Sequence, residues 1–388
     1  IFGEYKYIFK HVTHLALMNP RNSFIFFPNN HFLKFPTNIR YFMNKIKAAV
    51  VGATGYAGAE LVRLLALHPH VEISGLSSVS FEGKGIEEVY PNFKKMNLPK
   101  LTDADTAIAG ADVVFASLPH GLSEPLAEQC LASGALLVDL GADFRLESED
   151  EYKEWYKKPF DKPELHGGAV YAQPELFREN IKGAKIIANP GCYPTAAALA
   201  LFPALKLGFI EADGIIIDAK SGVTGAGRSL TQTTHYPEAN ESISAYKVGE
   251  HRHTPEIEQS LSYAAGHPMK VLFVPHLLPV NRGIEETIYA KLKDGVTIDE
   301  VREAYVKFYE NEQFVRIEAK GTSAQIRNVT RSNYCDISVH GDMRTGTLIL
   351  CSCIDNMVKG AAGQAIQNMN IYFGFDEDCG IDMLPAGF

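Results

Sequence analysis

One cysteine stands out as a residue that could do chemistry. Cys192 lies in the run Asn-Pro-Gly-Cys-Tyr-Pro-Thr, between an apolar run at residues 184–188 and an alanine- and leucine-rich run at residues 196–202. The first run predicts a short buried strand and the second a helix, so Cys192 should lie at the helix start. Free backbone N–H groups and the helix dipole at that place favour an anion, which lowers the pKa of a thiol. Cys192 is therefore a candidate nucleophile, and a buried structural cysteine is the alternative.

Two histidines supply a second candidate group. His251 and His253 come just before a predicted helix that has Thr254 as its N-cap and Pro255 at its first position. A histidine pair can bind a metal, but the neighbouring sequence suggests no third ligand, and we expect no metal site. A neutral imidazole can instead exchange a proton near neutral pH, which makes the pair a candidate general acid or base.

A glycine loop predicts a dinucleotide site upstream of these residues. The strand expected at residues 47–51 runs directly into a Gly-x-x-Gly-x-x-Gly loop, and a helical pattern follows it. Glycines let the backbone approach a pyrophosphate and the helix start supplies N–H donors, whereas a plain tight turn would need no such context. The cofactor-binding residues expected in this loop are Gly52, Thr54, Gly55, Tyr56, Ala57 and Gly58.

The end of the second expected strand, at residues 71–76, bears on the choice of cofactor. An NAD-selective site usually has an acidic residue there, which bonds the ribose 2′-hydroxyl. This chain has Ser77 and Ser78 instead, with Lys84 shortly after. Hydroxyls and a cation favour NADP over NAD, although a solvated loop is the alternative.

Further candidate cofactor residues follow from the order of the elements. Alternating strands and helices predict a parallel sheet that binds its ligand at the carboxyl ends of the strands. A later glycine-rich loop, residues 220–228, could cover a nicotinamide or hold an anionic substrate, and a helix of small residues opens near residue 355. The residues expected at the cofactor from these segments are Pro119, His120, Ser221, Gly222 and Asn356.

The length of the chain, 388 residues, predicts two domains. Strand-like runs at residues 270–275, 285–292, 334–339 and 347–354 predict a mainly antiparallel sheet in the second domain. We therefore expect an α/β, doubly wound, Rossmann-type NADP-binding domain beside an α+β catalytic domain. The expected limits are residues 43–189 with 356–388 for the first domain, and residues 190–355 for the second.

Composition excludes some classes of function. A net charge of −9 without a basic stripe argues against a nucleic-acid partner. Residues 1–42 hold no apolar run long enough to span a bilayer, so no membrane partner is expected.

We expect this extension to lie outside the native fold, with Met43 as the true start, and a transit peptide is the alternative. Six scattered cysteines suit a reducing compartment, so the expected location is cytoplasmic.

Taken together, these motifs resemble the N-acetyl-γ-glutamyl-phosphate reductase family of arginine biosynthesis, within the aspartate-semialdehyde dehydrogenase-like enzymes. The likeness rests on residues 52–58, 189–195, 221–228, 251–257 and 355–365, and it covers residues 43–388. It implies an NADPH-dependent oxidoreductase in which Cys192 is the nucleophile and His251 the acid/base, with His253 as the substitute. We also expect a homo-oligomer, either a dimer or a tetramer.

The reaction implied by the resemblance is reduction of a small acyl phosphate through a thioester on Cys192. Arg145 and Arg228 are the candidate ligands for the substrate carboxylate or phosphate, because guanidinium matches both anions; surface ion pairs are the alternative. Close alternatives for the function are an aspartate-semialdehyde dehydrogenase or an N-acetyl-aminoadipate-semialdehyde dehydrogenase. Alternatives from other classes are a cysteine acyltransferase or hydrolase and an NADP-sensing protein.

Overall fold

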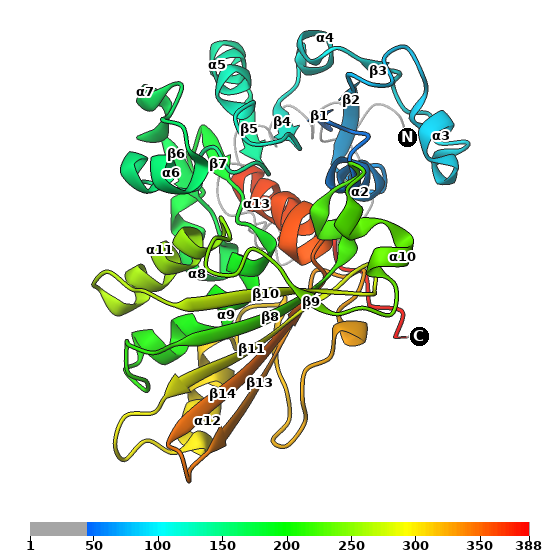
Figure 1. Cartoon of the computed structure of the whole chain (residues 1–388). Coiled ribbons are helices and arrows are strands. Elements are labelled where there is room, and N and C mark those ends of the chain that lie inside the picture. The colour runs from blue at the N-terminus through cyan, green and yellow to red at the C-terminus, as the bar shows by residue number, and fades with distance from the viewer. Residues whose placement is uncertain (1–44, 388) are drawn as a thin grey trace, which may run out of the picture. The chain divides into compact units, whose positions relative to one another are not determined.

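Two seven-stranded sheets organise the molecule (Figure 1). The structure is a computed structural model that describes residues 45–387. The expectations for residues 1–42 therefore lie outside the described residues. Residues 46–388 form one unit, and both sheets belong to it.

The first sheet is entirely parallel. Its central strands are fully buried apolar runs, which is the pattern expected when helices cover both faces of a parallel sheet. In spatial order the strands are β3 (Leu101–Thr102), β2 (Val71–Ser77), β1 (Ile46–Val51), β4 (Val113–Ala116), β5 (Leu136–Asp139), β7 (Ile186–Ala188) and β6 (Ala169–Tyr171).

The strand order places a crevice at the end of β1. The chain passes from β1 to β2 on one side and later crosses to β4 on the other, so β1 and β4 flank the topological switch point. Val51, the last residue of β1, pairs with Ser77 of β2 and with Ala116 of β4. The loops that follow these three strands therefore meet at one edge of the sheet.

The second sheet is mixed, with four antiparallel and two parallel pairs of neighbouring strands. Buried residues alternate with more exposed ones along residues 284–291 of this sheet, because one face packs on helices. In spatial order the strands are β12 (Val315–Ile317), β13 (Cys335–Asp342), β14 (Thr347–Ile354), β11 (Ile284–Lys291), β8 (Ile216–Gly222), β10 (Leu272–Leu278) and β9 (Ser244–Ala245). This pair of sheets confirms the predicted fold class.

Helix α9 (Cys192–Lys206) is the apolar helix on which the mixed sheet packs (Figure 1). Pro203 lies inside it and has no N–H to give to the carbonyl of Leu199, four residues earlier. The hydroxyl of Tyr309 donates to that carbonyl at 2.6 Å, and Tyr305 donates to the carbonyl of Ala200 at 2.5 Å. Tertiary hydrogen bonds thus hold this helix, and with it Cys192 at its first position.

The remaining helices cover the sheets or form short connections. Helix α11 (Thr254–Ala265) begins one residue earlier than predicted, because His253 is its N-cap and the Thr254 hydroxyl, which was expected to cap it, makes no hydrogen bond within the described residues. Helix α12 (Ile298–Phe308) has the capping box that Thr297 and Glu300 form. The other α-helices of the described residues are α2 (Tyr56–Leu65), α3 (Ile86–Val89), α4 (Ala104–Ile108), α5 (Ser123–Ser133), α6 (Glu149–Tyr156), α7 (Pro163–His166), α8 (Pro174–Phe177), α10 (Tyr236–Ala239) and α13 (Gly363–Phe373).

The C-terminal helix begins later than the sequence predicted. The Asp355 carboxylate accepts the N–H groups of Met357 and Val358, a local turn that competes with helix formation. A π-helix, η7 (Val358–Ala362), follows the turn and leads into α13. Apolar residues of η7 and α13 pack among those of β1 and α2, so the C-terminus joins the core under the parallel sheet.

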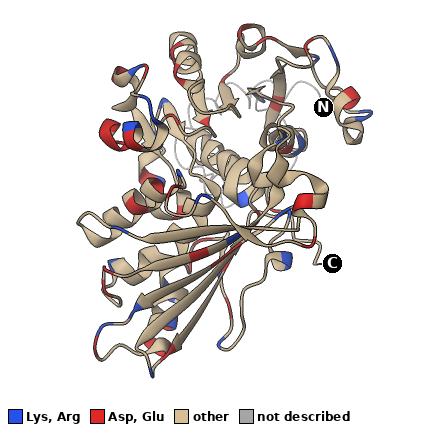
Figure 2. Ribbon diagram, in the orientation of Figure 1, with Lys and Arg blue, Asp and Glu red and all other residues tan. Residues whose placement is uncertain are grey.

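Two observations bear on large partners. Within residues 45–387, no helix is both long and apolar enough to cross a bilayer. Positive and negative residues are interspersed along the described ribbon, rather than gathered by sign (Figure 2). Such a distribution lacks the basic stripe that binds a phosphate backbone.

Candidate active site

The glycine loop joins β1 to α2 with the geometry of an anion cradle. Gly52 has φ +83°, and a Cβ there would lie 2.3 Å from the carbonyl oxygen of Ser117, so the close turn requires glycine. Gly55 precedes α2, and no side chain of the described residues caps this helix start. Its backbone N–H groups remain for a ligand, which fits the pyrophosphate of a dinucleotide.

The predicted adenosine end of the site lies at the end of β2. Ser77 and Ser78 are buried, and the hydroxyl of Ser78 lies 2.7 Å from that of Thr54 in the glycine loop. The hydroxyl of Tyr90 donates to the carbonyl of Thr54 at 2.9 Å. Two segments distant in sequence, those of Ser78 and Tyr90, therefore hold the loop.

Cys192 is the first residue of α9, directly after β7 and the Asn-Pro-Gly turn, as predicted. A Cβ on Gly360 of η7 would lie 2.7 Å from the Cβ of Cys192, so the C-terminal segment packs directly on the nucleophile candidate. The side-chain amide of Asn189 donates to the carbonyl of Ala361 at 3.2 Å. The cysteine turn is thus held by residues far away in sequence.

The thiol of Cys192 does not have the lowered pKa that the sequence predicted. Burial raises its pKa to about 12, against opposing effects of the Tyr193 N–H group and the Arg145 guanidinium. The helix start does favour the thiolate, but the loss of solvation is the larger effect. The resting thiol is therefore protonated, and it needs a base to become a nucleophile.

Both histidines lie beside the cysteine turn. The Nε2 atom of His253 lies 2.6 Å from the point that a Cβ on Gly191 would occupy. The His251 and His253 rings lie 4.9 Å apart between centroids, and both contact the ring of Tyr193. The structure thus brings Cys192 and the two predicted acid/base candidates together.

The two imidazoles are uncharged at neutral pH. Burial and, secondarily, Lys247 lower the pKa of His251 to about 3, and burial together with His251 lowers the pKa of His253 well below 6.5. The Nδ1 atom of His251 accepts the backbone N–H of His253 at 3.1 Å. In neutral His251 the proton is therefore on Nε2, which can donate to an oxygen.

Arg145 lies beside the cysteine turn and is held there by several contacts with the protein. It is buried, and it donates from Nε to the carbonyl of Asn189 at 2.9 Å and from Nη2 to that of Leu140 at 2.7 Å. Its Nη1 lies 3.4 Å from the carboxylate of Glu256. Each nitrogen of the guanidinium thus has a protein partner, so Arg145 helps to fix the cysteine turn, and its contact with substrate stays a prediction.

Glu256 completes this arrangement, and the sequence reasoning missed it. Its carboxylate is buried in the first turn of α11 and accepts the backbone N–H of Gly191 at 2.7 Å and the hydroxyl of Tyr171 at 3.1 Å. An acid directly after the His-Thr-Pro sequence was the available signal. Its partners come from segments distant in sequence, so the sequence alone did not reveal them.

Arg228 lies elsewhere than beside the cysteine. It donates from Nη1 to the carbonyl of Thr54 at 3.0 Å, and its guanidinium lies over the rings of Phe81 and Tyr90. These contacts place it at the glycine loop and the end of β2. The predicted pair of anion-binding arginines is therefore separated into two different environments.

The remaining predicted cofactor residues fall into two groups. Pro119 and His120 follow β4, and Arg252 lies 2.9 Å from the His120 ring. Ser221 and Gly222 end β8, and both the Ser221 hydroxyl and the Asn356 amide face the same glycine, Gly225.

A cavity of about 500 Å³ lies next to this second group and reaches the start of α2. It is lined by Tyr56, Thr224, Asn281, Arg282, Thr330 and Arg331.

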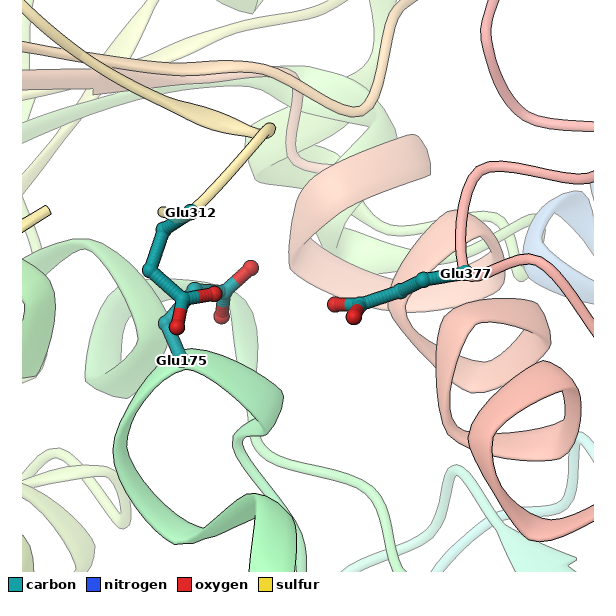
Figure 3. A group of neighbouring side chains, drawn as sticks. All are labelled: Glu175, Glu312 and Glu377. Carbon is teal, nitrogen blue, oxygen red and sulfur yellow. The ribbon is translucent and has the colours of Figure 1, made fainter. Parts of the chain in front are cut away.

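Three carboxylates, those of Glu175, Glu312 and Glu377, lie close together (Figure 3). Cations of the protein already accompany them. Arg178 pairs with both Glu312 and Glu377, and the buried Lys359 lies 2.5 Å from Glu175. The group forms an ion-pair network that ties α8 to the segments after α12 and α13.

Comparisons with known proteins show which family and which fold this chain resembles. Residues 47–184 match the family model described as semialdehyde dehydrogenase, NAD binding domain, and residues 192–356 match semialdehyde dehydrogenase, dimerisation domain. Among solved structures, aspartate semialdehyde dehydrogenase II of Vibrio cholerae has a TM-score of 0.65 at 17% identity, covering 85% of this chain and 98% of its own. Aspartate semialdehyde dehydrogenase with NADP from Candida albicans has a TM-score of 0.62 at 18% identity, covering 84% and 98%.

Curated relatives are much closer in sequence. The N-acetyl-gamma-glutamyl-phosphate reductase of Brachyspira hyodysenteriae is 54% identical over 352 residues, which are 88% of this chain and 100% of the relative. The reductase of the same name from Clostridium beijerinckii is 51% identical over 343 residues, again 88% and 100%. The chain therefore belongs to the semialdehyde dehydrogenase family and, within it, to the N-acetyl-gamma-glutamyl-phosphate reductases.

Proposed function

We propose that this protein reduces N-acetyl-L-glutamyl 5-phosphate to N-acetyl-L-glutamate 5-semialdehyde with NADPH and releases phosphate. The observation that carries the proposal is the meeting of Cys192, at a helix start, with two neutral histidines beside a dinucleotide cradle. The names of the close relatives support the choice of acyl phosphate.

The chemistry assigned to Cys192 is attack on the acyl carbon of the substrate. His253, whose Nε2 approaches the residue before the cysteine, is placed to accept the thiol proton. Phosphate leaves and a thioester remains, which divides one difficult step into two easier ones. NADPH, when bound, supplies the hydride that reduces the acyl group.

His251 is assigned the proton at the carbonyl-derived oxygen. Its Nδ1 is occupied by the backbone, so its Nε2–H is the available donor. A positioned acid or base of this kind typically contributes about 10²–10⁴-fold to the rate. Because burial lowers the pKa of His251 to about 3, the ring is neutral throughout the neutral range, and its Nε2–H can donate a hydrogen bond to the oxygen while negative charge develops there.

We assign different roles to the two parts of the chain that contain the two sheets. Residues 43–189 with 356–388 would bind the cofactor, through the glycine loop, Ser77 and Ser78, with His120 after β4 and with Ser221 and Asn356 from the other half. Residues 190–355 would carry the chemistry and, as the dimerisation model suggests, the contacts between copies in a dimer or tetramer. A cytoplasmic location suits the six cysteines, which are scattered along the chain.

Mass spectrometry of a quenched reaction tests the proposal most directly. Mixing the enzyme with N-acetyl-L-glutamyl 5-phosphate in the absence of NADPH should leave one acyl group on the peptide that contains Cys192. The Cys192→Ser variant should carry none, and its turnover should fall at least about 10³-fold, which is about 4 kcal/mol in the barrier. The same measurements with aspartyl phosphate report on substrate choice.

Retention of near-full activity by Cys192→Ser would exclude the thioester route. Equal or faster turnover of aspartyl phosphate would exclude the proposed substrate. Acylation of Cys192 without aldehyde formation when NADPH is added would favour an acyltransferase.

A further inference from the structure

Arg228 belongs to the segment that follows a strand of the mixed sheet but contacts residues around the parallel sheet. It follows the glycine-rich segment after β8 of the mixed sheet, yet its contacts are with the parallel-sheet half. Its guanidinium carbon lies 5.2 Å from the ring centroid of Phe81 and 5.1 Å from that of Tyr90. Two aromatic faces and the Thr54 carbonyl thus hold this cation where the glycine loop meets the end of β2.

The end of β2 is the place where doubly wound folds distinguish the two dinucleotides. An acid there bonds the ribose 2′-hydroxyl of NAD, whereas a nearby arginine accommodates the 2′-phosphate of NADP. This chain has the buried hydroxyls of Ser77 and Ser78 at that point, and the segment 71–100 contains no arginine. Residues 71–100, which form β2 and the segment after it, therefore do not supply the guanidinium that such a site uses.

We propose that Arg228 is that guanidinium, so that the catalytic half of the chain binds the 2′-phosphate of the cofactor. The inference rests on the proposed use of NADPH and adds a residue that determines the choice of dinucleotide. It also gives Arg228 a different anion from the one predicted from sequence, namely the cofactor phosphate instead of the substrate.

The surroundings of Arg228 suit a phosphate. The residue is exposed, so its guanidinium remains accessible to an incoming anion. Lys84 lies over the same Phe81 ring, 5.7 Å from its centroid, and provides a second cation at the same place. The hydroxyls of Ser78 and Thr54, 2.7 Å apart, add donors and acceptors. A doubly charged phosphate would find two cations and two hydroxyls together.

Equilibrium binding of NADPH and NADH, without substrate, tests the proposal. The Arg228→Gln variant should bind NADPH about 10- to 100-fold more weakly, because hydrogen bonds to charged groups are lost. Its affinity for NADH, which lacks the phosphate, should change less than about threefold. Arg228→Lys should recover part of the NADPH affinity, since it keeps the charge but not the bidentate geometry.

Arg344→Gln is the matched control, because Arg344 is an exposed arginine in the turn between β13 and β14 and pairs with Asp342, the last residue of β13. It should leave both affinities unchanged. Equal weakening of NADPH and NADH binding by Arg228→Gln would overturn the proposal and indicate a structural role in the loop. A raised KM for the acyl phosphate with unchanged NADPH affinity would overturn it in favour of the substrate. Because binding is measured without turnover, failure of the proposed reaction would be seen separately.

Discussion

The glycine loop and the cysteine turn both connect a strand of the parallel sheet to a helix, but they are built differently. The glycine loop presents backbone N–H groups of a single continuous segment, and Gly52 makes the close turn possible. The cysteine turn depends on buried side chains from distant segments, above all Arg145 and Glu256. One site is made by local backbone and the other by tertiary contacts.

The difference lies in what each ligand needs. A pyrophosphate is satisfied by backbone donors and a helix dipole, which a short sequence can specify. A nucleophile needs a thiol, a base and a fixed geometry, and a misplacement of about 1 Å can cost about 10²-fold in rate. We therefore expect the cysteine turn to be the more sensitive to single substitutions, and the predictions below test this.

The largest expected effect is on stability. Replacing Glu256 with alanine leaves the buried Arg145 without its carboxylate, which should destabilise the fold by about 3–5 kcal/mol in urea unfolding. The control is Glu149→Ala, which removes an exposed pair with Lys153 and should cost no more than about 0.5 kcal/mol. A loss below about 1 kcal/mol for Glu256→Ala would show that the buried pair is not what holds the turn.

The next effect is on catalysis alone. A Cβ at position 191 would lie 2.6 Å from His253 and 2.8 Å from Arg145, so Gly191→Ala must displace one of them. We expect kcat to fall about 10²-fold, whereas NADPH binding by fluorescence titration should change less than about threefold. If NADPH affinity fell in parallel with kcat, the two sites could not be treated as separately built.

The third effect is on the pH dependence of the thiol. With a pKa near 12, Cys192 is almost entirely protonated between pH 7 and pH 10. Its alkylation rate in the free enzyme should rise about tenfold per pH unit across that range, because only the thiolate reacts. Peptide mapping distinguishes Cys192 from the other cysteines, and Cys192→Ser gives the background. A rate that levels off below pH 8 would indicate the lowered pKa predicted from the helix start.

The smallest effect concerns the glycine loop. Thr54→Val removes the hydroxyl that lies 2.7 Å from Ser78 but leaves the backbone cradle in place. NADPH binding should weaken by about 0.5–1.5 kcal/mol in a titration, and kcat at saturating NADPH should change less than about twofold. A fall in kcat comparable to that of Gly191→Ala would show that the cofactor loop also positions the reacting groups.

Sequence patterns predicted those features that depend on local structure. The strand, glycine loop and helix around Gly52, the position of Cys192 at a helix start and the approach of the two histidines all follow from residue types within short segments. The fold class followed from the order of those segments.

Features that depend on burial were predicted poorly. The pKa of Cys192 is set by desolvation, and Arg145 is occupied by carbonyl groups and Glu256 from other segments. Arg228 contacts the glycine loop of the parallel sheet, although it follows a strand of the mixed sheet. In each case the sequence identified a residue capable of chemistry, but the groups that surround it come from distant segments and are brought to it only by folding.

The packing of the C-terminal segment on the cysteine turn also has a consequence for synthesis of the chain. Asn189 and Ala361 are hydrogen-bonded although they lie 172 residues apart, and Gly360 forms one wall around Cys192. While the ribosome is still adding residues before η7, the nucleophile has no such wall, whatever else has folded. The packing around Cys192 is therefore complete only once the chain has been synthesised and folded past residue 361.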